Sequence, residues 1–434
     1  MSFTLDSFFN PHLVPGTSRI DAVLSVIHAQ EEPTVVGSKL AYVFAVDVSG
    51  SMENNDKLVR AKLALRRAIA ALPPTAFFAV IAFNDRARVL VAMTQANAIA
   101  KSAADHAVQV LRAENGTVMS LALREIKAQF ASMPDAIKLA QFLTDGENAR
   151  EDQAALERAL ADCRGSFQCD CRGIGTDWHP DQLRLIANAL LGTADAVCDG
   201  EALDADLKSM IDRALGKGLA NAVLRLWSPK SARLLAVKQV MPEIVDLTAM
   251  GHRLDDKTLD FPLGAWGAET REYHVSIEVP AGSEGDEILV CRPSIVFEAN
   301  GAEVKVAGAN IVAAWTANEA LTTRINAQVA HYTGQTELAD SIKEGLEAKA
   351  RGDVDQATRL LGKAVKIAAS SGNDEVTRRL RKVVDVVDAD AGTVRIKSSA
   401  GRAAELELDM GGTRTVRRRA PTATAGSTTP GQPS

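Results

Sequence analysis

The sequence contains few aromatic residues, little net charge and no long apolar run. Aromatic residues make up only 4% of the 434 residues, which argues against single-stranded nucleic-acid binding by base stacking. The net charge of -6 is small for this length, so neither a nucleic-acid surface nor a membrane surface is indicated. No apolar stretch approaches the ~20 residues that span a bilayer, and the first residues lack the basic start and apolar core of a signal peptide. We therefore expect a cytoplasmic protein.

Cysteine is also scarce. The chain has five cysteines, an odd number whose spacing does not indicate a set of disulfide bonds, and this agrees with a reducing compartment. Cys169 and Cys171 alternate on an expected strand, with Cys163 just upstream. A zinc or redox role would need a second ligand pair at suitable spacing, and none is present. We predict buried free thiols.

Familiar catalytic patterns are missing as well. The seven histidines are scattered in unrelated contexts, and no Ser-His-Asp or Cys-His arrangement is readable. The phosphate-binding pattern G-x-x-x-x-G-K-[ST] does not occur, so any ATP chemistry would belong to another polypeptide. We expect a protein that is not an enzyme.

The most informative stretch is Leu40 to Met52, LAYVFAVDVSGSM. Its first seven residues have the length and composition of a strand buried on both faces, and Asp47, Ser49 and Ser51 follow abruptly. An ionised Asp at the end of a buried strand is costly unless a cation or hydrogen-bond donors compensate it. One carboxylate and two hydroxyls form a hard-oxygen set, which suits Mg²⁺ or Mn²⁺ rather than zinc.

Two further oxygen donors occur where a parallel sheet would bring them close. Thr117 precedes a helical pattern, and Asp145 ends a second apolar strand in IKLAQFLTDGEN. Ligand sites of open α/β sheets lie at the carboxyl ends of the strands, where Asp47 and Asp145 would both stand.

These elements resemble the von Willebrand factor type A domains and their metal-ion-dependent adhesion site. The D-x-S-x-S, distant Thr and T-D-G elements of that family match Asp47, Ser49, Ser51, Thr117 and Asp145, and the resemblance covers roughly residues 39–216. It implies a Mg²⁺ or Mn²⁺ ion held by these five side chains, directly or through water. It also implies one coordination position left open for an Asp or Glu carboxylate of a partner protein, so we expect a metal-dependent scaffold.

Three alternatives compete with this interpretation. Asp47, Ser49 and Ser51 could merely cap the next helix, but capping would not account for all five residues. A phosphotransferase of the haloacid dehalogenase type would need a second Asp where the chain has Ser49, so a Mg²⁺-dependent phosphatase is disfavoured. The third alternative is an accessory subunit of a larger machine, since related bacterial domains often work with AAA+ ATPases of the MoxR or chelatase kind.

The fold class follows from the order of the expected elements. Strands and helices alternate from residue 39 onward, which predicts an α/β unit with a doubly wound, mostly parallel sheet over 37–216. Regular short strands over 217–316 predict a β-sandwich. Apolar and polar residues largely alternate in the segment Ser18 to Gln30, which indicates a strand in a sheet with one face buried and the other exposed to solvent. We therefore expect the amino-terminal segment 1–36 to join the sandwich and the α/β unit to be an insertion.

The remaining residues are expected to be mainly helical. Residues 317–388 are rich in Ala, Leu, Glu and Lys, with expected breaks at 333–335, 351–353 and 370–373. A short β segment is expected over 389–410, followed by a disordered tail over 411–434 whose composition cannot bury a core.

Overall fold

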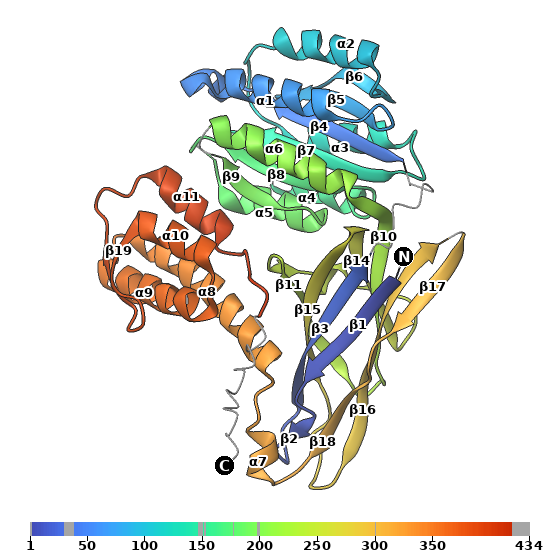
Figure 1. Cartoon of the computed structure of the whole chain (residues 1–434), viewed down its shortest axis with the longest axis vertical. Coiled ribbons are helices and arrows are strands. Elements are labelled where there is room, and N and C mark those ends of the chain that lie inside the picture. The colour runs from blue at the N-terminus through green and yellow to red at the C-terminus, as the bar shows by residue number, and fades with distance from the viewer. Residues whose placement is uncertain are drawn as a thin grey trace, which may run out of the picture.

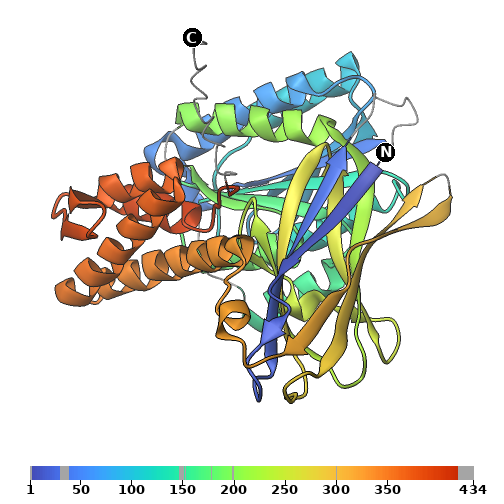
Figure 2. The ribbon, with the colours of Figure 1, turned by 60° about the horizontal axis from the view of Figure 1, so that its bottom comes forward.

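The chain is built from three units that lie side by side (Figure 1). The computed structural model describes residues 2–29, 39–145, 151, 153–176, 178–197, 200–299 and 301–418. An α/β unit lies at the top of the view, a β-sandwich below it, and a helical unit beside both. Figure 2 shows the same arrangement from below, with helix α8 reaching toward the sandwich.

The α/β unit is organised around a six-stranded sheet in the order β6-β5-β4-β7-β8-β9. Strand β4 pairs in parallel with β5 and β7, and the edge strand β6 is antiparallel to β5. This confirms an α/β fold with a mostly parallel sheet. The strands are β4 (Leu40–Asp47), β5 (Phe77–Phe83), β6 (Ala87–Gln95), β7 (Ile137–Thr144), β8 (Gln168–Ile174) and β9 (Ala194–Val197).

Helices cover both faces of this sheet, and β4 is buried along its whole length. Tyr42, Phe44 and Val46 pack on the side of α1, α2 and α6, while Ala41, Val43 and Ala45 pack on the side of α3, α4 and α5. Cys163, Cys169 and Cys171 are buried free thiols in the second of these cores, as predicted. The helical elements are η1 (Gly50–Asp56), α1 (Lys57–Ala71), α2 (Ala98–Gln109), α3 (Met119–Phe130), α4 (Gln153–Cys163), α5 (Pro180–Ala189) and α6 (Gly200–Leu215).

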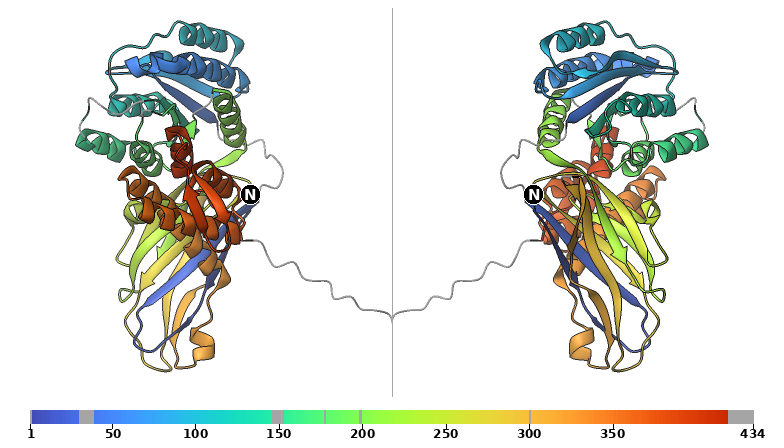
Figure 3. Two further views of the ribbon diagram at one scale, coloured as in Figure 1. Left: turned by 90° about the vertical axis from the view of Figure 1, so that its left-hand side faces the viewer. Right: turned by 90° about the vertical axis from the view of Figure 1, so that its right-hand side faces the viewer.

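Two sheets enclose a single apolar core in the sandwich. Figure 3 shows the sandwich from its two sides. One has the order β1-β3-β15-β11-β12, and the other β13-β14-β10-β16-β18-β2 with β17 paired to β16. The strands are β1 (Ser2–Phe9), β2 (His12–Leu13), β3 (Arg19–Ala29), β10 (Lys217–Trp227), β11 (Arg233–Met241), β12 (Val245–Asp246), β13 (His252–Arg253), β14 (Thr258–Gly267), β15 (Glu269–Glu278), β16 (Glu287–Ala299), β17 (Ala302–Ala307) and β18 (Ile311–Trp315), with η2 (Thr248–Met250) between β12 and β13.

The amino-terminal strand β3 pairs with β15, which lies about 250 residues later in the sequence. The chain leaves the sandwich after β3 and returns at β10. His28 Nδ1 lies 2.7 Å from the Gly267 carbonyl oxygen, and Lys217 pairs with the same Gly267. The two ends of the α/β unit therefore meet at one place on the sandwich.

The third unit consists mainly of helices. Helix α8 runs without interruption through residues 333–335, so the break expected there is wrong, whereas the expected turn at 351–353 separates α8 from α9. The elements are α7 (Glu319–Thr322), α8 (Ala327–Ala350), α9 (Val354–Ser371), α10 (Asp374–Val383), β19 (Val384–Asp388), β20 (Thr393–Ile396) and α11 (Arg402–Gly411). No helix in the described ranges is long and apolar enough to cross a membrane.

The β segment expected over 389–410 is largely wrong. The hairpin lies earlier, between β19 and β20, and residues 402–411 form helix α11. Leu406 and Met410, one helical turn apart, pack on the α/β unit, while Leu408 packs on the helical unit. Because α11 buries side chains on both sides, its apolar residues alternate in sequence like those of a strand.

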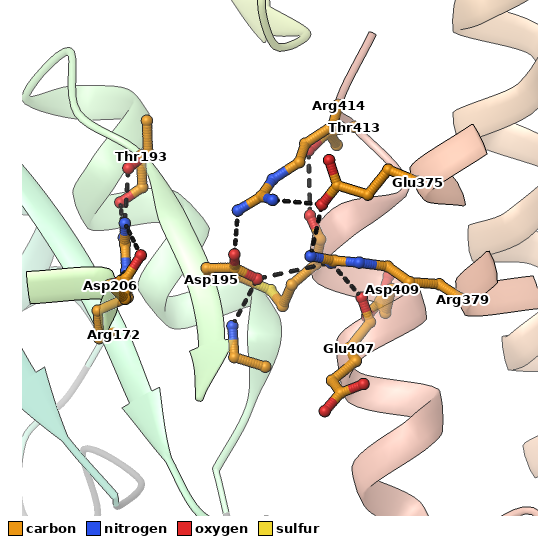
Figure 4. Close-up of polar contacts among 12 residues, drawn as sticks. Arg172, Thr193, Asp195, Asp206, Glu375, Arg379, Glu407, Asp409, Thr413 and Arg414 are labelled. Atoms are coloured by element: carbon orange, nitrogen blue, oxygen red, sulfur yellow. Dashed lines mark hydrogen bonds and ion pairs between the residues drawn. The ribbon is translucent and has the colours of Figure 1, made fainter. Parts of the chain in front are cut away.

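The beginning of the expected disordered tail is in fact ordered; residues 419–434 lie outside the described residues. The Arg414 side chain pairs with Asp195 of β9 and Glu375 of α10, as Figure 4 shows. Backbone hydrogen bonds join Thr413 to Ile244 and Thr415 to Pro242 in the sandwich. This short segment therefore connects all three units, which composition alone could not indicate.

Candidate metal centre

The predicted site lies where β4 and β7 end, side by side and parallel. Asp47 is the last residue of β4, and Asp145 directly follows β7. Both residues are fully buried, with 0% exposure. The register pairs Val46 with Leu143, which brings Asp47 beside Thr144. The sheet topology thus brings together two carboxylates separated by almost a hundred residues.

Four of the five predicted residues are linked through a chain of hydrogen bonds. Asp47 Oδ1 accepts a 2.8 Å hydrogen bond from the Ser49 backbone N–H, and Ser49 Oγ lies 3.1 Å from Ser51 Oγ. Ser51 Oγ donates to Asp145 Oδ1 over 2.8 Å. The loop after β4 therefore connects the acids of both strands.

Thr117 stands on the loop between α2 and α3, buried with 3% exposure. This loop is anchored to the one after β4, since Gly50 N–H donates to the Asn115 carbonyl oxygen over 3.0 Å. Among the contacts of the described residues, the Thr117 hydroxyl makes no hydrogen bond to the other four residues. The structure thus places Thr117 on the adjoining loop but does not connect it to the cluster.

Two residues in the cluster were missed at the sequence level. Thr144 Oγ1 donates to Asp47 Oδ2 over 2.5 Å. Lys57 Nζ donates to Asp145 Oδ2 over 2.7 Å, and the Lys57 side chain is only 4% exposed. A signal for Lys57 existed, because it lies on the same helical stripe as the buried residues Ala61 and Ala64.

A third acid, Asp85, lies two residues beyond the end of β5. Its oxygen Oδ1 is buried and has no hydrogen-bond partner among the residues that the structure describes. The neighbouring Asn84 carbonyl oxygen accepts from Val118 N–H, so this loop adjoins the one that carries Thr117. Asp85 is a further oxygen donor at the same sheet edge that sequence patterns did not single out.

The electrostatics favour a cation beside Asp47. Burial raises the pKa of Asp47 to about 6, the charge of Asp145 acts in the same direction, and the hydrogen bonds from Thr144 and Ser49 oppose the shift. An ionised Asp47 is therefore costly in this position.

The donor chemistry fits a hard divalent ion. Carboxylate and hydroxyl oxygens are the ligands that Mg²⁺ and Mn²⁺ prefer. In the described ranges, no three His, Cys, Asp or Glu side chains are grouped so that they could hold a metal ion, so hydroxyls would have to complete the ligand set. At Asp145, the Lys57 ammonium already stands where a cation is favoured.

Two family models match parts of the chain. A family model described as von Willebrand factor type A domain matches residues 40–196, and one described as von Willebrand factor type A C-terminal domain matches residues 366–412. A search of curated proteins returned no match.

Solved structures extend the likeness to nearly the whole chain. A protein described as von Willebrand factor type A from Catenulispora acidiphila is 40% identical, with a TM-score of 0.89 over 96% of this chain and 97% of its own. The ArnB paralog VWA2 from Sulfolobus acidocaldarius is 16% identical, with a TM-score of 0.56 over 95% of this chain and 98% of its own. At that identity the second likeness shows the fold alone.

Proposed function

The chain belongs to the von Willebrand factor type A family, and on that premise we propose that it is a binding module that holds a partner protein through a divalent metal ion. Domains of this family generally mediate protein interactions. The observation that supports the metal most directly is the hydrogen-bonded link from the buried Asp47 to the buried Asp145 through Ser49 and Ser51.

Each residue has a distinct part in the proposal. Asp47, Ser49, Ser51, Thr117 and Asp145 hold Mg²⁺ or Mn²⁺, directly or through water, and the bound ion offers a coordination position to an Asp or Glu carboxylate. Thr144 and the Ser49 N–H fix the two oxygens of Asp47. Asp145 is fixed by Ser51 and Lys57, so the ligands are ordered before any partner arrives.

A pull-down from the lysate of the native host tests this function. The wild type, Asp145→Asn and Asp170→Asn are compared in Mg²⁺ and in EDTA. Asp170 is a matched control because it accepts hydrogen bonds from Thr193 N–H and Oγ1, both of 2.7 Å, at the far end of its strand.

We expect one partner to be captured by the wild type and by the control in Mg²⁺, and to be lost in EDTA and with Asp145→Asn. Equal capture of that partner in EDTA would show that no metal bridges the interface.

A further inference from the structure

Lys57 is held in the site by the surrounding backbone. It is the first residue of α1, and the two preceding residues, Asn55 and Asp56, adopt left-handed conformations with φ of 54° and 57°. Such values are uncommon outside glycine, so the chain is turned sharply at this point. Gly175 lies against the Lys57 side chain, so close that a Cβ added to this glycine would be 2.7 Å from Lys57 Cε. The ammonium is thereby confined next to Asp145.

The formal charge of the hydrogen-bonded cluster follows from these contacts. Asp47 and Asp145 contribute two negative charges, and Lys57 contributes one positive charge. Summed over these three side chains alone, the charge is -1 with the ammonium and -2 without it. All three groups are buried, so screening by solvent is weak and each charge matters.

The inference rests on the proposed function, in which the site binds first a divalent ion and then a partner carboxylate. The ammonium makes the charge around both ligands one unit more positive, whatever other acids, such as Asp85, lie at this edge of the sheet. In a buried place that unit opposes the divalent ion and favours the incoming carboxylate.

We propose that Lys57 is a built-in counter-ion that weakens binding of the metal ion and strengthens binding of the carboxylate to the metal-loaded site. Its charge repels the ion and attracts the carboxylate. Loss of that charge should therefore change the two affinities in opposite directions, which a merely structural role would not do.

The test measures both affinities on the full chain. Lys57→Met and Lys57→Gln are purified in Mn²⁺ and then exchanged into buffers of defined metal content; Gln keeps a hydrogen-bond donor for Asp145, so it protects the test against a folding defect. Arg60→Met is the matched control, because Arg60 lies one turn further along the same helix and is exposed.

Mn²⁺ binding is followed by electron paramagnetic resonance. Acetate is the carboxylate probe, detected through the loss of water-proton relaxation when it displaces a metal-bound water.

We expect Mn²⁺ to bind both Lys57 variants at least about tenfold more tightly and acetate to bind about tenfold more weakly, with Arg60→Met unchanged. If the wild type binds Mn²⁺ and neither Lys57 variant binds it more tightly, or acetate binds them equally well, Lys57 is not the counter-ion, while the proposed function stands. If only the Lys57 variants bind Mn²⁺, the counter-ion is supported and the proposed function fails for the native chain. Absence of Mn²⁺ binding in every protein overturns both.

Discussion

Substitution of Asp47 by Asn should stabilise the protein in EDTA even though it removes a proposed metal ligand. Asp47 accepts hydrogen bonds from the Ser49 N–H and the Thr144 hydroxyl. Asn can accept the first, and its amide can donate to the Thr144 oxygen, so both contacts are retained with one donor reversed. The main change is therefore the loss of a buried charge.

The magnitude follows from the pKa of Asp47, which burial raises from 3.8 to about 6. Two pKa units correspond to about 3 kcal/mol. Because the folded pKa lies above the unfolded one, the native protein retains a proton that the unfolded chain has lost between about pH 4 and pH 6. Wild-type stability should thus fall as the pH rises through that window. Above it, Asp47→Asn should be more stable by about 3 kcal/mol, and below pH 4 the two proteins should be equal.

Urea unfolding in EDTA at several pH values measures this difference, with hydrogen exchange over residues 40–145 to assign the transition to the α/β unit. Asp170→Asn serves as the control, since its carboxylate has similar hydrogen-bond partners but is not part of the cluster. Addition of Mg²⁺ should stabilise the wild type and this control but not Asp47→Asn. A variant at Asp47 that is no more stable than the wild type in EDTA at pH 8 would refute the view that an ionised Asp47 is costly.

Three further predictions follow from the same contacts. In thermal melts, Mg²⁺ at a hundredfold excess over its Kd should stabilise the wild type by about 2.7 kcal/mol, whereas identical melting in EDTA would count against the site. Mn²⁺ binding should weaken as the pH falls below about 6, because Asp47 then takes up a proton; calorimetric affinities that stay constant from pH 8 to pH 5 would contradict this. Deletion of residues 1–36 should remove hydrogen-exchange protection from the sandwich, since β3 pairs with β15, and loss of protection confined to 39–216 would contradict the insertion of the α/β unit.

The part of the fold that depends on continuous apolar runs could be predicted from sequence. LAYVFAV is apolar throughout because β4 is covered by helices on both faces, and its abrupt change at Asp47 marked the strand end. The proximity of Asp145 followed from parallel pairing. Prediction failed where one element serves two units: α11 packs against two cores, so its pattern imitated a strand.

Residues identified by their partners rather than by their pattern were also missed. Lys57 was overlooked because lysine on an amphipathic helix is normally exposed; its place on the buried stripe gave a signal, but the ion pair with Asp145 that favours its burial is visible only in the structure. Arg414 falls within the tail that we expected to be disordered, yet Asp195 and Glu375 hold it in place. Such pairings join residues about 40 to 220 positions apart, beyond the reach of local sequence patterns.

The most direct test of the metal centre is a crystal of the chain grown with Mn²⁺ and measured at a wavelength where manganese scatters anomalously. We expect a single strong peak at the carboxyl ends of β4 and β7, surrounded by oxygens of Asp47, Ser49, Ser51, Thr117 and Asp145. Absence of a peak at this edge of the sheet in crystals grown at saturating Mn²⁺, with the five side chains ordered, would contradict the metal centre.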